Sequence, residues 1–238
     1  MSEDNIFAEV DEDLRREQLL QQWDKYGVYL IIAAVLIVAS VGGYKGYVWW
    51  QNKVSIESGQ AYYKAEDLLI SKKTDEAMAA LSKIAKDAPS GYQTLASLEM
   101  AAIEMRKGNK KQAVALFDKI SVNGADAILR DFAKIQAATL LVDEADAKEI
   151  SRRVEGLNID TNPWRYSARE LLGLAAFRSG KLAESEKLFG QLVSDPSTPP
   201  EINKRAEVIL SLIVKSETPA TAKDESAPKE AAKQQATQ

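Results

Sequence analysis

The chain of 238 residues contains no cysteine and no histidine. Without thiol and imidazole groups it cannot form disulfides, thiolate nucleophiles, Ser-His-Asp triads or the commonest zinc sites. A glycine-rich phosphate loop is also missing, because Gly42 and Gly43 lie inside an apolar run and the other glycines are isolated. These absences exclude most familiar catalytic machinery, so we expect no enzymatic activity, no cofactor and no metal site.

Neither sign of charge is in large excess. The sequence has 31 basic and 35 acidic residues, which gives a formal net charge of −4. Residues 1–26 carry eight acids and three bases, so the rest of the chain is close to neutral. Binding to a phosphate backbone requires a basic surface, and we therefore expect no nucleic-acid partner. A hydrophobic content of 45% is enough for a folded core and too low for a protein with many membrane spans.

One long apolar run stands near the N-terminus. Between Lys25 and Lys45 lie 19 uncharged residues, Tyr26 to Tyr44. As a helix this run is roughly 28 Å long, close to the ~30 Å hydrocarbon core of a bilayer. Aromatic residues suited to the two membrane interfaces flank it, namely Trp23, Tyr26 and Tyr29 before it and Tyr44, Tyr47, Trp49 and Trp50 after it. The pattern predicts one transmembrane helix over residues 27–48, in contact with the lipid bilayer.

Two other interpretations of the apolar run are a buried core helix and a cleaved signal peptide. Core helices usually interrupt such a run with polar positions. A signal peptide would have a short basic segment before the run, whereas here that segment is 26 residues long and acidic, and Ala39 to Val41 is a poor cleavage box. We expect the run to stay attached and the chain to cross the membrane once.

Residues 51–215 are predicted to form an all-α domain. From Ile56 to Lys215 apolar residues recur every three or four positions, and alternating β-branched runs are almost absent. Short helix-breaking segments divide this region, namely Ala88–Gly91, Lys107–Asn109, Val122–Gly124, Asn158–Pro163, Ser179–Gly180 and Asp195–Pro200. The spacing leaves room for about one or two helices between successive breaks.

A 36-residue repeat runs through this domain. Small residues recur at Ala65, Ala101, Ala137 and Gly173, and the second-helix positions give Ala77, Ala113 and Ser185, followed by Leu81, Phe117 and Phe189. The pattern resembles the tetratricopeptide repeat (TPR), in which a small residue lets two helices approach and a large one fills the space between repeats. The expected fold is one transmembrane helix followed by a TPR-like α-solenoid of four helical hairpins and a closing helix over residues 201–213. An ordinary helix bundle without repeats is the alternative.

The third repeat departs from the pattern. Glu149 and Arg153 stand where the second helix should have alanine and a large apolar residue. We therefore expect this helix to be displaced or packed differently.

The repeat register also selects candidate contacts for a protein partner. First helices line the concave face of such an array, whereas second helices lie on the outside. The positions that the motif places near the concave face are Tyr62, Glu66, Leu98, Met105, Arg106 and Arg178.

The two ends of the chain differ from the domain. Residues 1–26 form an acidic tail in which Asp13 to Trp23 is amphipathic, so this stretch either lies against lipid or a partner helix or is a solvated start to the span. Residues 216–238 lack Leu, Ile, Val, Met and aromatic residues. Such a segment cannot offset its ordering entropy, and we expect it to be disordered.

The layout as a whole resembles the YfgM-type ancillary subunits of the SecYEG translocon. The likeness is strongest at Trp23 to Gly27, through the span, and from Gly43 to Gln51. It covers about residues 20–215, and the acidic start and the C-terminal tail depart from the family pattern.

The resemblance implies a location and a set of partners. The family has its N-terminus in the cytoplasm, one span in the inner membrane and its repeat domain in the periplasm. Its partners are the SecYEG translocon, a membrane-bound periplasmic chaperone and exported client proteins. Charge alone gives no orientation, because three bases precede the span and three follow within a comparable distance.

Two other functions stay open at this point. A membrane-anchored scaffold for another envelope complex, in cell division or outer-membrane biogenesis, would have the same layout. A carboxylate-dependent hydrolase of envelope glycans would need two acids that face a cleft, and no acid pair stands out in the sequence.

Overall fold

The structure is a computed structural model that describes residues 3–217, with side chains over residues 23–215. Over residues 3–217 the chain forms nine α-helices and one short 3₁₀ helix, and no strand. The all-α prediction is therefore confirmed. The described part of the chain divides into two compact units, with the division between Gln60 and Ala61.

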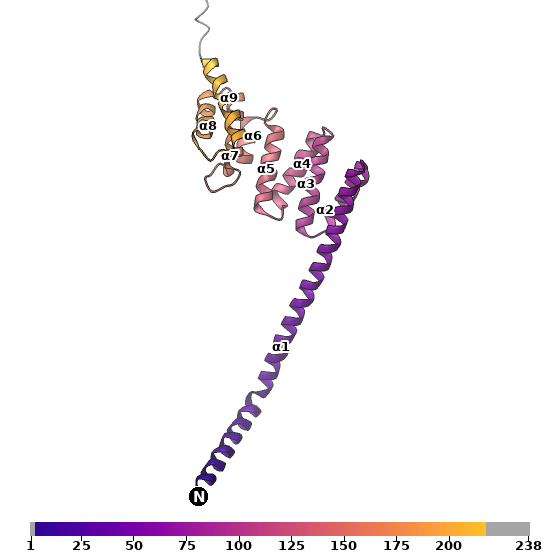
Figure 1. Ribbon diagram of the computed structural model, residues 1–238, viewed down its shortest axis with the longest axis vertical. Coiled ribbons are helices and arrows are strands. Elements are labelled where there is room, and N and C mark those ends of the chain that lie inside the picture. Colours follow the sequence, from indigo (N-terminus) through magenta and orange to yellow (C-terminus); the bar gives the residue numbers. More distant parts are fainter. Residues whose placement is uncertain (1–2, 218–238) are drawn as a thin grey trace, which may run out of the picture. The chain divides into compact units, whose positions relative to one another are not determined.

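Helix α1 (Glu3–Ile70) runs for 68 residues without a break and contains the apolar run (Figure 1). No proline precedes Pro89, so nothing in this stretch removes a backbone donor from the helix. The proposed boundaries at residues 26, 48 and 51 all fall inside α1. The side chains of residues 13–22, which we expect to be amphipathic, lie outside the part described with side chains.

Within α1 the apolar run is a candidate membrane span by length and composition. Its most apolar 18-residue window has a mean hydropathy of 2.2, and 6% of that window is buried within the protein. Aromatic and basic side chains pair at both ends of the run. Lys25 Nζ lies 5.5 Å from the centroid of the Tyr26 ring, and Lys53 Nζ lies 5.8 Å from that of Trp49. These pairs stand where the interfaces of a bilayer would be.

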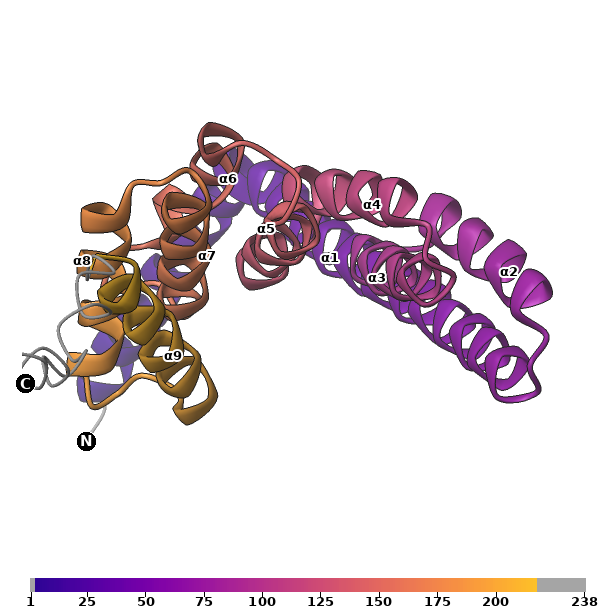
Figure 2. The ribbon, with the colours of Figure 1, turned by 90° about the horizontal axis from the view of Figure 1, so that it is seen from above.

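The second unit begins with the end of α1 and continues as antiparallel helices, each packed mainly on the next one along the chain. These helices are α2 (Thr74–Asp87), α3 (Ser90–Arg106), α4 (Lys110–Asn123), α5 (Ala127–Leu141), α6 (Ala147–Val154), the 3₁₀ helix η1 (Glu155–Leu157), α7 (Arg165–Arg178), α8 (Leu182–Ser194) and α9 (Pro200–Glu217). All six predicted breaks overlap connections between them, although Ser90 and Gly91 belong to α3, Val122 and Asn123 to α4, and Pro200 to α9. In Figure 2, α2, α4 and α6 lie on the outer side of an arc and α3, α5 and α7 on its inner side.

The small residues of the repeat lie in the core, as the 36-residue register predicts. Ala65, Ala101 and Ala137 have no exposed surface. Gly173 takes the same place in the fourth repeat, where the Phe189 ring lies so close that an added Cβ would come within 2.9 Å of it. The Ser185 hydroxyl donates a hydrogen bond of 3.0 Å to the Gly173 carbonyl from the same side. The repeat register therefore sets how closely the two helices of a hairpin approach.

The turns inside the hairpins repeat as well. Lys72, Gly108 and Gly180 all have positive φ, at 62°, 77° and 74°. Each stands in a three-residue connection and is followed two residues later by the next helix. A left-handed residue at this place allows the chain to leave the first helix and reverse.

The third hairpin differs, as its sequence predicts. Its turn is five residues long, 142–146, so α6 begins one position later than the other second helices do in the 36-residue register. Its buried residues are accordingly Ile150 and Val154, one position after Glu149 and Arg153. The shift turns Arg153 toward α4, where its guanidinium pairs with Asp118 and, 2.7 Å away on its own helix, with Glu149.

Helix α9 is the predicted closing helix, and it packs mainly on α8. Ile202 and Ala206 complete a buried cluster with Phe189 and Leu192. Of the predicted disordered tail, Ser216 and Glu217 belong to α9, and residues 218–238 lie outside the described residues.

Candidate protein-interaction surface

Two faces of α3 are buried and the third is open. Ala96 and Ile103 pack into a cluster with Leu81 of α2, and Ala101 packs with Phe117 of α4. The remaining face carries residues at helical spacing that stay wholly or partly exposed, namely Leu95, Glu99, Ala102, Met105 and Arg106. Leu95 is 41% exposed and Met105 is 40% exposed. A solvent-facing stripe with large apolar side chains is the kind of surface that takes part in protein contacts.

The end of α1 borders this stripe. Tyr62 is half-buried and packs against the cluster of α1, α2 and α3, with its ring centroid 6.5 Å from that of Tyr92. Glu66 follows one turn later and is also half-buried. On α3, Arg106 Nη2 donates a hydrogen bond of 3.0 Å to Glu99 Oε1. We call this set the α1–α3 patch and define it by Tyr62, Glu66, Leu95, Glu99, Met105 and Arg106.

The acidic residues of the patch affect the pKa of Tyr62. Burial raises the pKa of its phenol from 10.0 to about 12, and the negative charges of Glu66 and Glu99 act in the same direction. A hydrogen bond with Glu66 adds to the effect. The two carboxylates therefore act together on one point of the surface, although they come from different helices.

Four of the six predicted contact residues belong to the patch, and the other two have structural contacts elsewhere. Leu98 is half-buried and packs on the cluster of Ala101 and Phe117. The Arg178 guanidinium donates hydrogen bonds to the carbonyls of Val142 and Ala145, which close the end of α5. Both side chains thus connect repeats, and their part in partner binding stays a prediction.

The equivalent surface of α5 and α7 is largely occupied by contacts within the protein. Lys134 Nζ lies 2.8 Å from Asp131, and Asn162 from the α6–α7 connection donates to the same carboxylate at 3.0 Å. On α7, Glu170 accepts two hydrogen bonds from Arg205 of α9. These polar groups of α5 and α7 therefore already have partners within the protein.

The sequence alone pointed to neither Leu95 nor Glu99. A usable signal exists for both, since Leu95 lies one turn before Leu98 and Glu99 lies seven residues before Arg106, on the same side of a helix.

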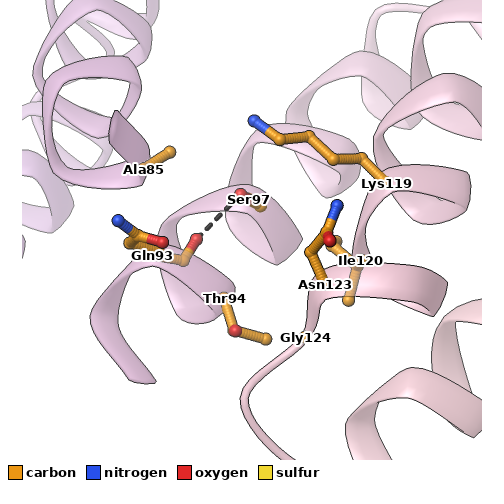
Figure 3. A pocket seen from close by; sticks show the side chains of 8 residues that line it. All are labelled: Ala85, Gln93, Thr94, Ser97, Lys119, Ile120, Asn123 and Gly124. Carbon is orange, nitrogen blue, oxygen red and sulfur yellow. Dashed lines mark hydrogen bonds between the residues drawn. The ribbon is translucent and has the colours of Figure 1, made fainter. Parts of the chain in front are cut away.

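A small notch of about 30 Å³ lies between α2, α3 and α4 (Figure 3). Its size corresponds to one or two water molecules. The residues that line it are Ala85, Gln93, Thr94, Ser97, Lys119, Ile120, Asn123 and Gly124. Several of their polar groups already have partners, as in the 2.7 Å bond from the Ser97 hydroxyl to the Gln93 carbonyl. Within residues 23–215 no group of three or more acidic side chains is placed to hold a metal ion.

Comparison with known proteins supports the repeat assignment. No curated protein and no solved structure matches the chain. One family, described as a tetratricopeptide repeat-like domain, matches residues 21–195. This match begins ahead of the apolar run and ends just after α8, so it includes both the candidate span and the four hairpins. The chain therefore belongs to the tetratricopeptide repeat-like domain family.

Proposed function

We propose that this protein is a single-pass inner-membrane binding protein that serves the Sec translocon as an ancillary subunit and assists the chaperoning of exported proteins in the periplasm. The observation that carries the proposal is the joining of an apolar run and a repeat domain by one uninterrupted helix, α1. Domains of this repeat family typically bind proteins. The layout resembles that of the YfgM-type subunits, which supports the choice of the translocon.

The mechanism that we propose is tethering. A domain anchored by one span is confined to the membrane surface, and its effective concentration near other membrane-bound components rises accordingly. Even weak contacts through the α1–α3 patch then suffice to hold a partner. No chemical step on the partner is required.

Site-specific photo-crosslinking in cells tests both the surface and the partner. A photoreactive amino acid is placed at Leu95 or Met105 of the full chain, and at Lys119 on α4 as the control. We expect crosslinks from the first two positions to translocon subunits, a periplasmic chaperone or exported proteins, and few from Lys119. Mass spectrometry identifies the crosslinked proteins after purification in mild detergent.

The result also separates the candidate functions. Crosslinks to cell-division or outer-membrane assembly proteins, without translocon components, would show that the Sec assignment is wrong and that the protein is a scaffold for another complex. Equal crosslinking from all three positions would contradict the assignment of the surface.

A further inference from the structure

The α1–α3 patch carries an acidic group, Glu66, whose partner there is a neutral phenol and not a base. Of the two carboxylates, Glu99 is held by Arg106. Glu66 takes part in none of the ion pairs found among residues 23–215, and its neighbour on the patch is the neutral phenol of Tyr62. The formal charge of the patch is therefore negative, with two acids and one base.

The apolar side chains of the patch determine the length of the partner segment that it can bind. Leu95 and Met105 lie ten positions apart on α3, which corresponds to about 15 Å along the helix axis and about 80° around it. A helical segment laid beside α3 places its own apolar side chains at the same spacing over roughly three turns. The complementary partner thus has an apolar stripe of this length and a positive charge beside it.

We propose that the α1–α3 patch selects partner segments that combine an apolar helical stripe with a lysine or arginine. This inference rests on the proposed function as a protein-binding domain. The apolar side chains cover Leu95 and Met105, and the base pairs with Glu66. The patch disfavours segments of the same shape with acidic flanks, because like charges then face each other.

Binding of designed peptides to the purified full-length chain in mild detergent tests this selection. Three fluorescein-labelled peptides of about 16 residues have identical leucine stripes and differ only in their flanks, which are lysine, glutamine or glutamate. Fluorescence anisotropy gives the dissociation constant of each. We expect the lysine peptide to bind about tenfold more tightly than the glutamate peptide, with the glutamine peptide between them. The difference should shrink as salt is added.

Substitutions in the protein assign the preference to residues. Glu66→Gln should lower the affinity for the lysine peptide about threefold to tenfold and leave the glutamine peptide nearly unchanged. Leu95→Ser should weaken the binding of all three peptides by a similar factor. The matched control is Glu186→Gln on α8, an exposed acid that takes part in none of the ion pairs found among residues 23–215. Circular dichroism verifies that each variant keeps its helix content.

Several outcomes overturn the inference. Equal affinities for the lysine and glutamate peptides, equal effects of the Glu66 and Glu186 substitutions, or no binding of the lysine peptide at about 1 mM would each do so. If crosslinking from Leu95 still captures envelope proteins in these cases, only the charge selection is wrong and the proposed function stands. If crosslinking fails as well, the proposed function fails with it.

Discussion

At the scale of single residues, the contact of Phe189 with Gly173 shows what holds a hairpin together. The ring has no exposed surface and reaches the first helix only because Gly173 has no side chain. Phe117 has the same role in the second repeat, where it packs with Ala101.

Truncation of these rings should therefore destabilise the repeat domain. We expect Phe189→Ala or Phe117→Ala to lower the free energy of unfolding by ~3–5 kcal/mol, the usual cost of a buried cavity of this size. Urea unfolding of the full chain, followed by circular dichroism, measures the change. Lys119→Ala on the exposed face of α4 is the control and should unfold as the original chain does. Unchanged midpoints for both phenylalanine variants would contradict the 36-residue register.

Tyr62 should make the stability of the repeat domain depend on pH in the alkaline range. Its pKa is about 12 in the folded chain and near 10.0 when unfolded, so the folded state holds this proton more tightly. The resulting stabilisation is fully present below pH 10.0 and is lost as the pH rises toward 12. Urea unfolding between these values should show a smaller loss of stability for Tyr62→Phe than for the original chain. The exposed neighbour Tyr63 provides the control, and an identical loss in Tyr62→Phe and Tyr63→Phe would be evidence against this origin.

At the scale of elements, the hairpin turns differ in how well their residues suit a positive φ. Gly108 and Gly180 adopt this conformation without steric cost, whereas Lys72 carries a Cβ in the same place. A left-handed conformation costs roughly 1–2 kcal/mol for a residue with a side chain.

Substitution of the residue with positive φ should have opposite effects on stability in the two kinds of turn. We expect Gly108→Ala to destabilise the domain by about 1 kcal/mol and Lys72→Gly to stabilise it by a similar or smaller amount, because glycine loses more entropy on folding. Thermal melts of the two variants measure the signs. Destabilisation by Lys72→Gly would show that the lysine side chain contributes more than the backbone conformation costs.

Helix α1 combines two roles in one element. Its run from Tyr26 to Tyr44 has the length of a bilayer core, and its last residues supply the first helix of the repeat domain. A protein anchored in this way should stay with membranes after carbonate extraction and keep its N-terminal residues. Fractionation followed by mass spectrometry of the N-terminus is the measurement. A soluble form that begins near Gly42 would instead identify the run as a cleaved signal peptide.

At the scale of the whole molecule, the proposed function requires the repeat domain to lie in the periplasm. Protease added to intact spheroplasts should then cut within residues 61–215, which belong to the second compact unit. Cytoplasmic proteins in the same sample should stay intact and provide the control. Cleavage only after the spheroplasts are lysed would place the domain in the cytoplasm and overturn the proposed topology.

Much of the fold was determined by the sequence alone, because it depends on local patterns. The apolar run, the breaks at glycine and proline and the 36-residue recurrence of small residues each act over a few turns of helix. Even the displaced third hairpin was signalled by Glu149 and Arg153, since charged side chains do not enter a core unpaired.

The tertiary structure alone decided which surface residues are available. Arg178 has the same register as the exposed Arg106, yet it caps α5 through carbonyls 33 and 36 residues away, and Leu98 packs into a cluster. Glu99 joins Tyr62 and Glu66 only because α3 packs beside the end of α1. Burial and charge pairing depend on contacts between helices distant in sequence, and a repeat register fixes the direction of a side chain without fixing what it meets.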